Sequence, residues 1–180
     1  MTAFRIAPMA PPIRWLTWGL CALPVAFVVA GVSGRSLAPM LGVGLFLCLL
    51  YAAVWVWWRP SRFELSEDGL ALVFPGRRRL VPASQIAAVQ AVTSAQLRER
   101  FGLLLRVGAG GLWGGFGWLW SRRGWLEFYV STLSGYVLVE RRGRMPLLIS
   151  PEHPARFVAA LRAVAASAPV DPAQPGSTRK

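Results

Sequence analysis

Two long apolar stretches dominate the hydropathy pattern, and both lie in the first third of the chain. Residues 15–32 and 37–58 contain no charged side chain, and only the short segment 33–36 separates them. As helices they would span about 27 and 33 Å, which is close to the thickness of the hydrocarbon core of a bilayer. Because backbone groups inside a bilayer must satisfy one another, the pattern predicts two antiparallel membrane-spanning helices joined by a tight turn.

The residues that flank the two runs predict how this hairpin sits in the membrane. Five tryptophans lie at the ends that an antiparallel pair brings to one face: Trp15, Trp18, Trp55, Trp57 and Trp58. Four arginines flank the same face: Arg5, Arg14, Arg59 and Arg62. The connection holds only Arg35. Since tryptophan favours the membrane interface and arginine favours the cytoplasmic side, we expect an aromatic belt there and both termini in the cytoplasm.

Other interpretations of the apolar runs stay open. They could be two buried helices of a soluble core, or the first run could be a cleaved signal peptide, in which case the second would still be an anchor. Cys21 and Cys48 lie one in each run. We expect both to act as small apolar residues, with a disulfide between them as the less favoured alternative.

Beyond Pro60 the pattern changes to short segments in which polar and apolar residues alternate. Phe63 and Leu65, for example, alternate with Glu64 and Ser66, which is the period of a half-buried strand. Turn residues separate these segments, so the stretch up to residue 149 is predicted to form about seven short strands. Residues 93–101 are polar and are predicted to hold a short helical turn.

The C-terminal part of the chain has the signature of a helix followed by a tail. Ser150-Pro151-Glu152 provides a cap, a proline for the first turn and an acidic residue. Phe157, Val158, Leu161 and Val164 then share one helical face. We therefore expect an N-terminal tail (1–14), a transmembrane hairpin (15–58), a β domain with its closing helix (60–166) and a disordered tail (167–180).

A family resemblance follows from this order of elements. The residues that carry it are Leu80, Val81, Pro82, Ser84, Ile86, the glycine-aromatic segment 110–117, Tyr129, Thr132, Ser150, Pro151, Pro154, Phe157 and Leu161. On these residues the segment 60–165 resembles the bacterial PH-like (pleckstrin-homology-like) domains of small membrane proteins. The resemblance implies an α+β fold, in which an antiparallel β-barrel or sandwich is capped by a C-terminal helix, and a membrane-associated module without catalysis. It does not imply phosphoinositide binding, because the first hairpin turn is the acidic 67–69.

The charge balance points to anionic partners. The net charge is +12, and no acidic residue precedes Glu64. With a membrane anchor next to the domain, the inner leaflet is the nearest anionic surface. Its attraction for each well-placed cation contributes ~1 kcal/mol of binding free energy. The basic clusters fall at predicted turns: Arg77, Arg78, Arg79, Arg122, Arg123, Arg141, Arg142 and Arg144. They are interpreted as solvated turns or as a rim that faces lipid or an acidic protein. Nucleic acid is not expected, since no recognition helix carries the charges.

The glycine-rich segment 108–118 interleaves glycine with Trp113, Phe116 and Trp118. It lacks the Lys-Ser or Lys-Thr of a phosphate-binding loop and the glycine spacing of a dinucleotide fingerprint. The favoured interpretation is a structural turn between two strands, and the alternative is a loop that dips into the membrane or binds a partner.

No catalytic, cofactor-binding or metal-binding set can be assembled from the sequence. His153 is the only histidine, and the acidic residues are predicted to be solvated surface charges: Glu64, Glu67, Asp68, Glu127 and Glu140. We therefore expect a non-enzymatic module for protein interaction or scaffolding at the inner face of a bacterial membrane. The expected partners are the bilayer and a membrane or cytoplasmic protein, or a second copy of the chain. A lipid-sensing module that uses the arginine turns, and an accessory subunit of a transport or assembly complex, are the alternatives.

Overall fold

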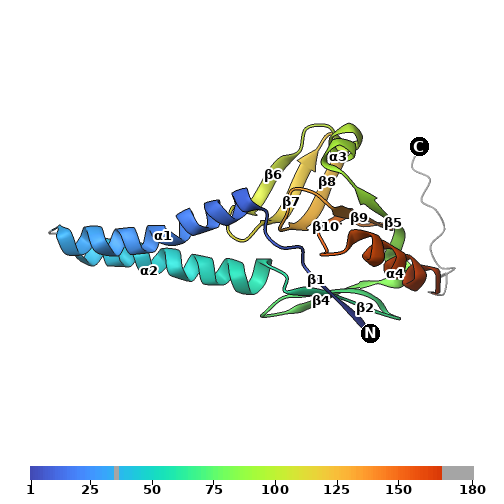
Figure 1. Cartoon of the computed structure of the whole chain (residues 1–180), viewed down its shortest axis with the longest axis horizontal. Coiled ribbons are helices and arrows are strands. Elements are labelled where there is room, and N and C mark those ends of the chain that lie inside the picture. Colours follow the sequence, from blue (N-terminus) through green and yellow to red (C-terminus); the bar gives the residue numbers. More distant parts are fainter. Residues whose placement is uncertain (35–36, 168–180) are drawn as a thin grey trace.

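Two long helices project from one end of a β domain in the computed structural model, which describes residues 1–34 and 37–167 (Figure 1). Helix α1 covers Pro11–Ser33, and α2 covers Leu37–Ala53 and continues as the π-helical turn η1, Val54–Trp58. Both helices are long and apolar enough to cross a membrane. The two predicted apolar helices are thus confirmed.

Small residues and one tyrosine account for the close packing of the two helices. Gly31 and Gly44 lie at the contact, and a Cβ at Gly31 would come 2.8 Å from the Cβ of Met40. Pro24 has no backbone N–H, so it leaves the carbonyl of Leu20 without a helical partner. The hydroxyl of Tyr51, on the other helix, donates a hydrogen bond to that carbonyl at 3.0 Å. Cys21 and Cys48 are both free thiols on the helix surfaces.

The first sheet has the order β1-β2-β3-β4 and is antiparallel throughout. Its strands are β1 Thr2–Arg5, β2 Arg62–Ser66, β3 Gly69–Val73 and β4 Arg78–Pro82. The interpretation of residues 1–14 as a tail is therefore wrong. Thr2–Arg5 pair with β2, and α1 already begins at Pro11. A strand of four residues has too little alternation to be seen in the sequence, and it forms because β2 offers a free edge.

The second sheet has the order β5-β9-β10-β8-β7-β6. Its strands are β5 Ile86–Val92, β6 Leu105–Gly110, β7 Gly115–Ser121, β8 Gly124–Val130, β9 Tyr136–Arg141 and β10 Leu147–Ile149. The pair β8–β10 is parallel and the others are antiparallel. The α+β class is confirmed. Of the expected antiparallel barrel or sandwich, the closed barrel is wrong, and the second sheet is mixed because β8 and β10 are parallel. Among the described strands none pairs one sheet with the other, so the barrel is not closed.

The two sheets face each other across the main core, and each of the two remaining helices covers part of a sheet. Helix α4, Pro154–Ser167, lies between the sheets at the end far from α1 and α2 (Figure 1). Its Phe157 is fully buried against Phe4 and Phe63. Helix α3, Ser94–Phe101, packs Leu97 and Phe101 on the outer face of the second sheet. The predicted helices at both places are confirmed; the predicted tail lies outside the described residues, apart from Ser167, which ends α4.

The segment between β1 and α1 connects the two sheets. The backbone N–H of Ala7 donates to the carbonyl of Ser150 at 2.9 Å, and that of Ala10 donates to the carbonyl of Ser131 at 3.1 Å. The side chain of Ser150 in turn accepts a hydrogen bond from the N–H of Ser131. The chain thus enters α1 from a fixed point at the end of the second sheet.

Candidate functional site

The nine tryptophans are confined to two parts of the chain. Five lie at the domain end of the two long helices, and four lie in the β6–β8 segment: Trp113, Trp118, Trp120 and Trp125. No tryptophan occurs in the first sheet, in α3 or in α4. The region where the helices meet the second sheet is therefore the candidate site.

The turn between β6 and β7 is docked on α1. The hydroxyl oxygen of Thr17 accepts a hydrogen bond from the N–H of Trp113 at 2.9 Å. The same oxygen lies 2.8 Å from the carbonyl oxygens of Ile13 and Gly111, and its single proton can be donated to either. The turn closes on itself through the N–H of Gly111, which donates to the carbonyl of Gly114 at 3.0 Å. These backbone groups of Gly111, Trp113 and Gly114 thus have hydrogen-bond partners.

Aromatic contacts join the same region to the end of α2. Trp55 meets Trp113 edge to face with ring centroids 4.8 Å apart, and Trp58 meets Trp118 at 5.8 Å. Val54 belongs to the core of the β domain itself. The domain is therefore packed directly on the hairpin and does not hang from a flexible linker.

An exposed apolar surface continues from this joint along the second sheet. We call it the tryptophan surface, and its members are Leu105, Val107, Trp118, Trp120 and Trp125. Leu105 pairs with Trp120, which pairs with Trp125, and Val107 pairs with Trp118. Residues directly opposite one another on neighbouring strands point to the same face of a sheet. Each of the five is 41–48% exposed, so these large apolar side chains form one water-facing group.

The docked turn packs against the start of the first apolar run. A Cβ at Gly111 would lie 2.9 Å from Leu16 and 3.3 Å from Leu20. Both leucines belong to the first turns of the apolar run that begins at Trp15, where the tryptophan belt is expected. Exposed tryptophans beside a hydrophobic helix pair are typical of a membrane-water interface.

The structure separates the three aromatic residues predicted as interaction candidates. Phe116 is 1% exposed and belongs to the main core, so it cannot contact a partner. Trp113 is half-buried against Trp55, and Trp118 is exposed on the tryptophan surface. The glycine-rich segment 108–118 forms the predicted turn only at residues 111–114, and the rest of it belongs to strands β6 and β7. Trp120 and Trp125 were not among the predicted residues, although Trp118 and Trp120 are spaced as neighbours on one face of a strand.

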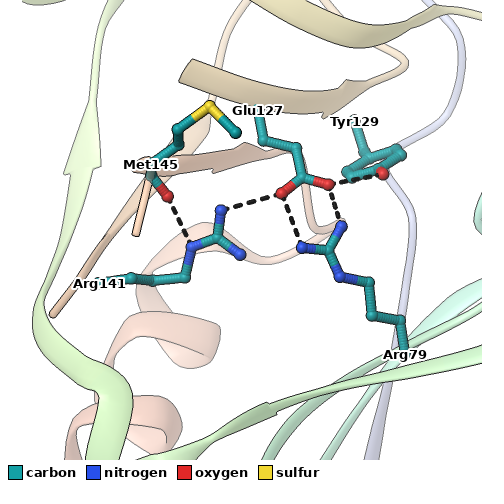
Figure 2. A network of polar contacts seen from close by, with 5 residues as sticks. All are labelled: Arg79, Glu127, Tyr129, Arg141 and Met145. Carbon is teal, nitrogen blue, oxygen red and sulfur yellow. Dashed lines mark hydrogen bonds and ion pairs between the residues drawn. The ribbon is translucent and has the colours of Figure 1, made fainter. Parts of the chain in front are cut away.

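Two of the predicted surface arginines belong to a buried network instead (Figure 2). Arg79 forms a two-pronged ion pair with Glu127, and Arg141 donates to the same carboxylate at 2.9 Å. Tyr129 donates its hydroxyl proton to Glu127 at 2.8 Å. The predictions of Glu127 as a solvated charge and of Arg79 and Arg141 as turn residues are wrong. Glu127 is only 4% exposed, and the two arginines lie in strands β4 and β9.

Opposing effects set the protonation of this network. Burial raises the pKa of Glu127. The hydrogen bonds and charge of Arg79, together with hydrogen bonds from Tyr129 and Arg141, lower it by more, so the pKa of Glu127 lies below its usual value. Burial, together with the charge and hydrogen bond of Glu127, raises the pKa of Tyr129 to about 12. Because Arg79 comes from the first sheet and Glu127 from the second, the network is a polar clamp between the sheets.

The other predicted arginines are exposed. Arg78 begins strand β4 and pairs with Glu64, and the rest come from three separate turns: Arg77, Arg122, Arg123, Arg142 and Arg144. Arg77 lies beside the hairpin, because the N–H of the neighbouring Gly76 donates to the carbonyl of Val56 at 3.3 Å. Arg122 and Arg123 lie at the opposite end of β7 from the turn that contacts α1. The three turns thus do not form one cluster next to the helices.

Comparisons of the chain with protein-family models, with characterised proteins and with solved structures found no match. Within residues 1–34 and 37–167, no group of three or more His, Cys, Asp or Glu side chains is placed to bind a metal ion.

Proposed function

We propose that the protein is a non-enzymatic module anchored in a bacterial inner membrane by its helical hairpin. The hairpin holds the β domain in a fixed orientation against the cytoplasmic face, where the domain binds or scaffolds another protein. The family resemblance to PH-like membrane proteins agrees with this proposal.

The tryptophan pairs at the junction of hairpin and sheet, Trp55 with Trp113 and Trp58 with Trp118, carry the proposal. A flexible linker would be sufficient to tether the domain. Here, instead, Val54, Trp55 and Trp58 pack into or against the domain. Such a joint fixes which side of the domain faces lipid. The tryptophan surface then lies at the interface, where tryptophan is most stable.

The flanking charges support the cytoplasmic orientation. Arg59 follows the second apolar run directly, and its guanidinium lies 4.1 Å from the ring centroid of Trp55. A cation stacked on an interfacial tryptophan is well placed to meet anionic headgroups. The connection between the helices contributes only Arg35.

Membrane extraction combined with protease access tests the anchor and its orientation. We expect the protein to stay in the membrane pellet after alkaline carbonate washing. In inverted inner-membrane vesicles a protease should cleave the domain, and in intact spheroplasts it should not. Release by carbonate would overturn the anchor, and cleavage in spheroplasts would overturn the orientation.

The free edge of the second sheet is the position where we expect the partner to bind. Strand β6 ends the sheet, so within the described chain no strand pairs with its outer edge. An unpaired edge is a template for strand addition by another chain, including a second copy. A photo-crosslinking amino acid at Leu105 should capture the partner in native membranes, and one at Ala159, exposed on α4, is the matched control. Equal capture at both positions would contradict docking at the edge.

A further inference from the structure

An apolar cavity of about 820 Å³ opens on the outer face of the second sheet, beside α3. Its floor is formed by core side chains that are at most 8% exposed: Leu119, Phe128, Val130 and Leu148. Leu97 of α3 adds to the wall. This size falls within the range of about 300–1,000 Å³ that is usual for small-molecule sites.

The rim of the cavity carries apolar side chains that are exposed to water. Leu103, before β6, is 72% exposed, and Leu133, after β8, is 53% exposed. With the floor, they give the cavity a mostly apolar lining that reaches solvent. A long hydrocarbon chain is the kind of guest that such a lining accommodates.

The charged side chains of the cavity are both cations. Arg98 and Arg106 line it, and no aspartate or glutamate does. Within the described residues neither arginine forms an ion pair, whereas Arg100, on another face of the same helix, is paired with Glu140 at 2.6 Å. The cavity thus combines an apolar floor with uncompensated positive charge.

Two glycines make room for one of these cations at the edge of the floor. The guanidinium of Arg106 lies 5.5 Å from the ring centroid of Phe128. A Cβ at Gly110 would come 2.6 Å from its Nη1 atom, and a Cβ at Gly115 would come 3.4 Å from its Cζ atom. Any larger residue at 110 would displace the guanidinium from this position.

The Arg106 end of the cavity lies next to the membrane helices. Gly110 directly precedes the turn in which the carbonyl of Gly111 meets Thr17 of α1. The cavity therefore starts beside the proposed membrane surface and runs along the outer face of the sheet towards α3. An amphiphile could leave the bilayer at this point without crossing water.

We propose that this cavity binds a long-chain fatty acid taken from the adjacent bilayer. The carboxylate lies beside the guanidinium of Arg106, Arg98 of α3 adds positive charge to the same cavity, and the acyl chain lies on the floor of Leu119, Phe128 and Val130. Charged hydrogen bonds to the guanidinium of Arg106 select an anionic headgroup. The inference rests on the proposed membrane anchoring for the source of the ligand and is independent of how deep the tryptophan surface lies.

Photolabelling of the full chain in lipid nanodiscs tests the proposal. The probe is palmitate with a diazirine near the end of its chain, and labelled peptides are mapped by mass spectrometry. We expect saturable labelling of the segments 94–104 and 128–136, competed by oleate and not by oleyl alcohol. Labelling confined to α1 and α2 would overturn the site, even if carbonate extraction had confirmed the anchor.

Charge variants distinguish a site that binds an anionic headgroup from an apolar surface that binds any hydrocarbon chain. Arg106→Gln should weaken competition by oleate about tenfold, because it removes a charged hydrogen bond, and Arg98→Gln should weaken it less, because it removes only a more distant positive charge. Arg144→Gln, exposed in the β9–β10 turn outside the cavity, is the matched control. Leu133→Glu should abolish labelling by placing a negative charge on the rim. Unchanged competition in all of these variants, or equal competition by oleyl alcohol, would overturn the proposal.

Discussion

The hydroxyl of Thr17, in the first apolar helix, accepts a hydrogen bond from the backbone N–H of Trp113, which is 96 residues further along the chain. This bond joins the hairpin to the turn between β6 and β7 at a buried position, since Thr17 is 5% exposed. Exchange of this N–H proton therefore reports whether the domain is docked on the two long helices.

Replacing Thr17 by valine keeps the shape and removes the hydrogen-bonding group. The N–H of Trp113 then loses its partner, which costs about 1–3 kcal/mol. We expect amide hydrogen exchange at Trp113 in nanodiscs to accelerate about tenfold or more. Thr17→Ser keeps the hydroxyl and should exchange like the wild type, and an unchanged rate in Thr17→Val would show that the turn is not docked in the membrane.

The contact between the two helices is tested by a pair of glycine substitutions in α1. Gly31→Ala places a Cβ 2.8 Å from the Cβ of Met40, so the helices must separate, at a cost of about 1–3 kcal/mol. Gly19→Ala meets nothing within 4 Å and serves as the matched control. Thermal unfolding in mild detergent should show a lower Tm for Gly31→Ala alone. Equal Tm values for the two variants would contradict the close packing.

The clamp between the sheets predicts a large effect of neutralising one buried carboxylate. Glu127→Gln leaves Arg79 and Arg141 without a counter-charge, and the side chain of Arg141 is only 3% exposed. Breaking a buried ion pair in this way costs about 3–5 kcal/mol, so the Tm should fall steeply. Glu64→Gln also removes the partner of two arginines, Arg62 and Arg78, but at the surface. If the Glu64 variant lowered the Tm as much, burial would not be the source of the effect.

The raised pKa of Tyr129 predicts a loss of stability at alkaline pH. The folded protein holds the phenolic proton until a pKa of about 12, because of burial and the neighbouring Glu127, whereas an unfolded tyrosine releases it near 10. Stability from this group is therefore complete below about pH 10 and falls, by up to about 2 kcal/mol, as the pH rises towards 12. Denaturant unfolding across this range should show a shallower decline in Tyr129→Phe. Identical slopes in the two proteins would contradict the pKa shift.

The helical hairpin could be predicted from the sequence because the length of an apolar run and its flanking tryptophans are local properties. Most strands could be predicted from their alternation for the same reason. The role of Glu127 could not, because its partner Arg79 lies 48 residues away and the pair forms only when the two sheets meet. Strand β1 depends in the same way on the edge of β2. Thr17 had a visible signal, since a single polar residue in an apolar run needs a partner, but nothing in the sequence identifies that partner as Trp113.

The most direct test of the account is the depth of the tryptophan surface in a bilayer. A spin label is attached at Trp120→Cys in a chain that carries Cys21→Ser and Cys48→Ser, and at Ala159→Cys on α4 as the control. In vesicles that contain anionic lipid, we expect the label at 120 to be more accessible to oxygen than to a water-soluble nickel complex, and the label at 159 to show the reverse. If the label at 120 were as accessible to the nickel complex as the label at 159, the domain would not lie on the membrane through this surface.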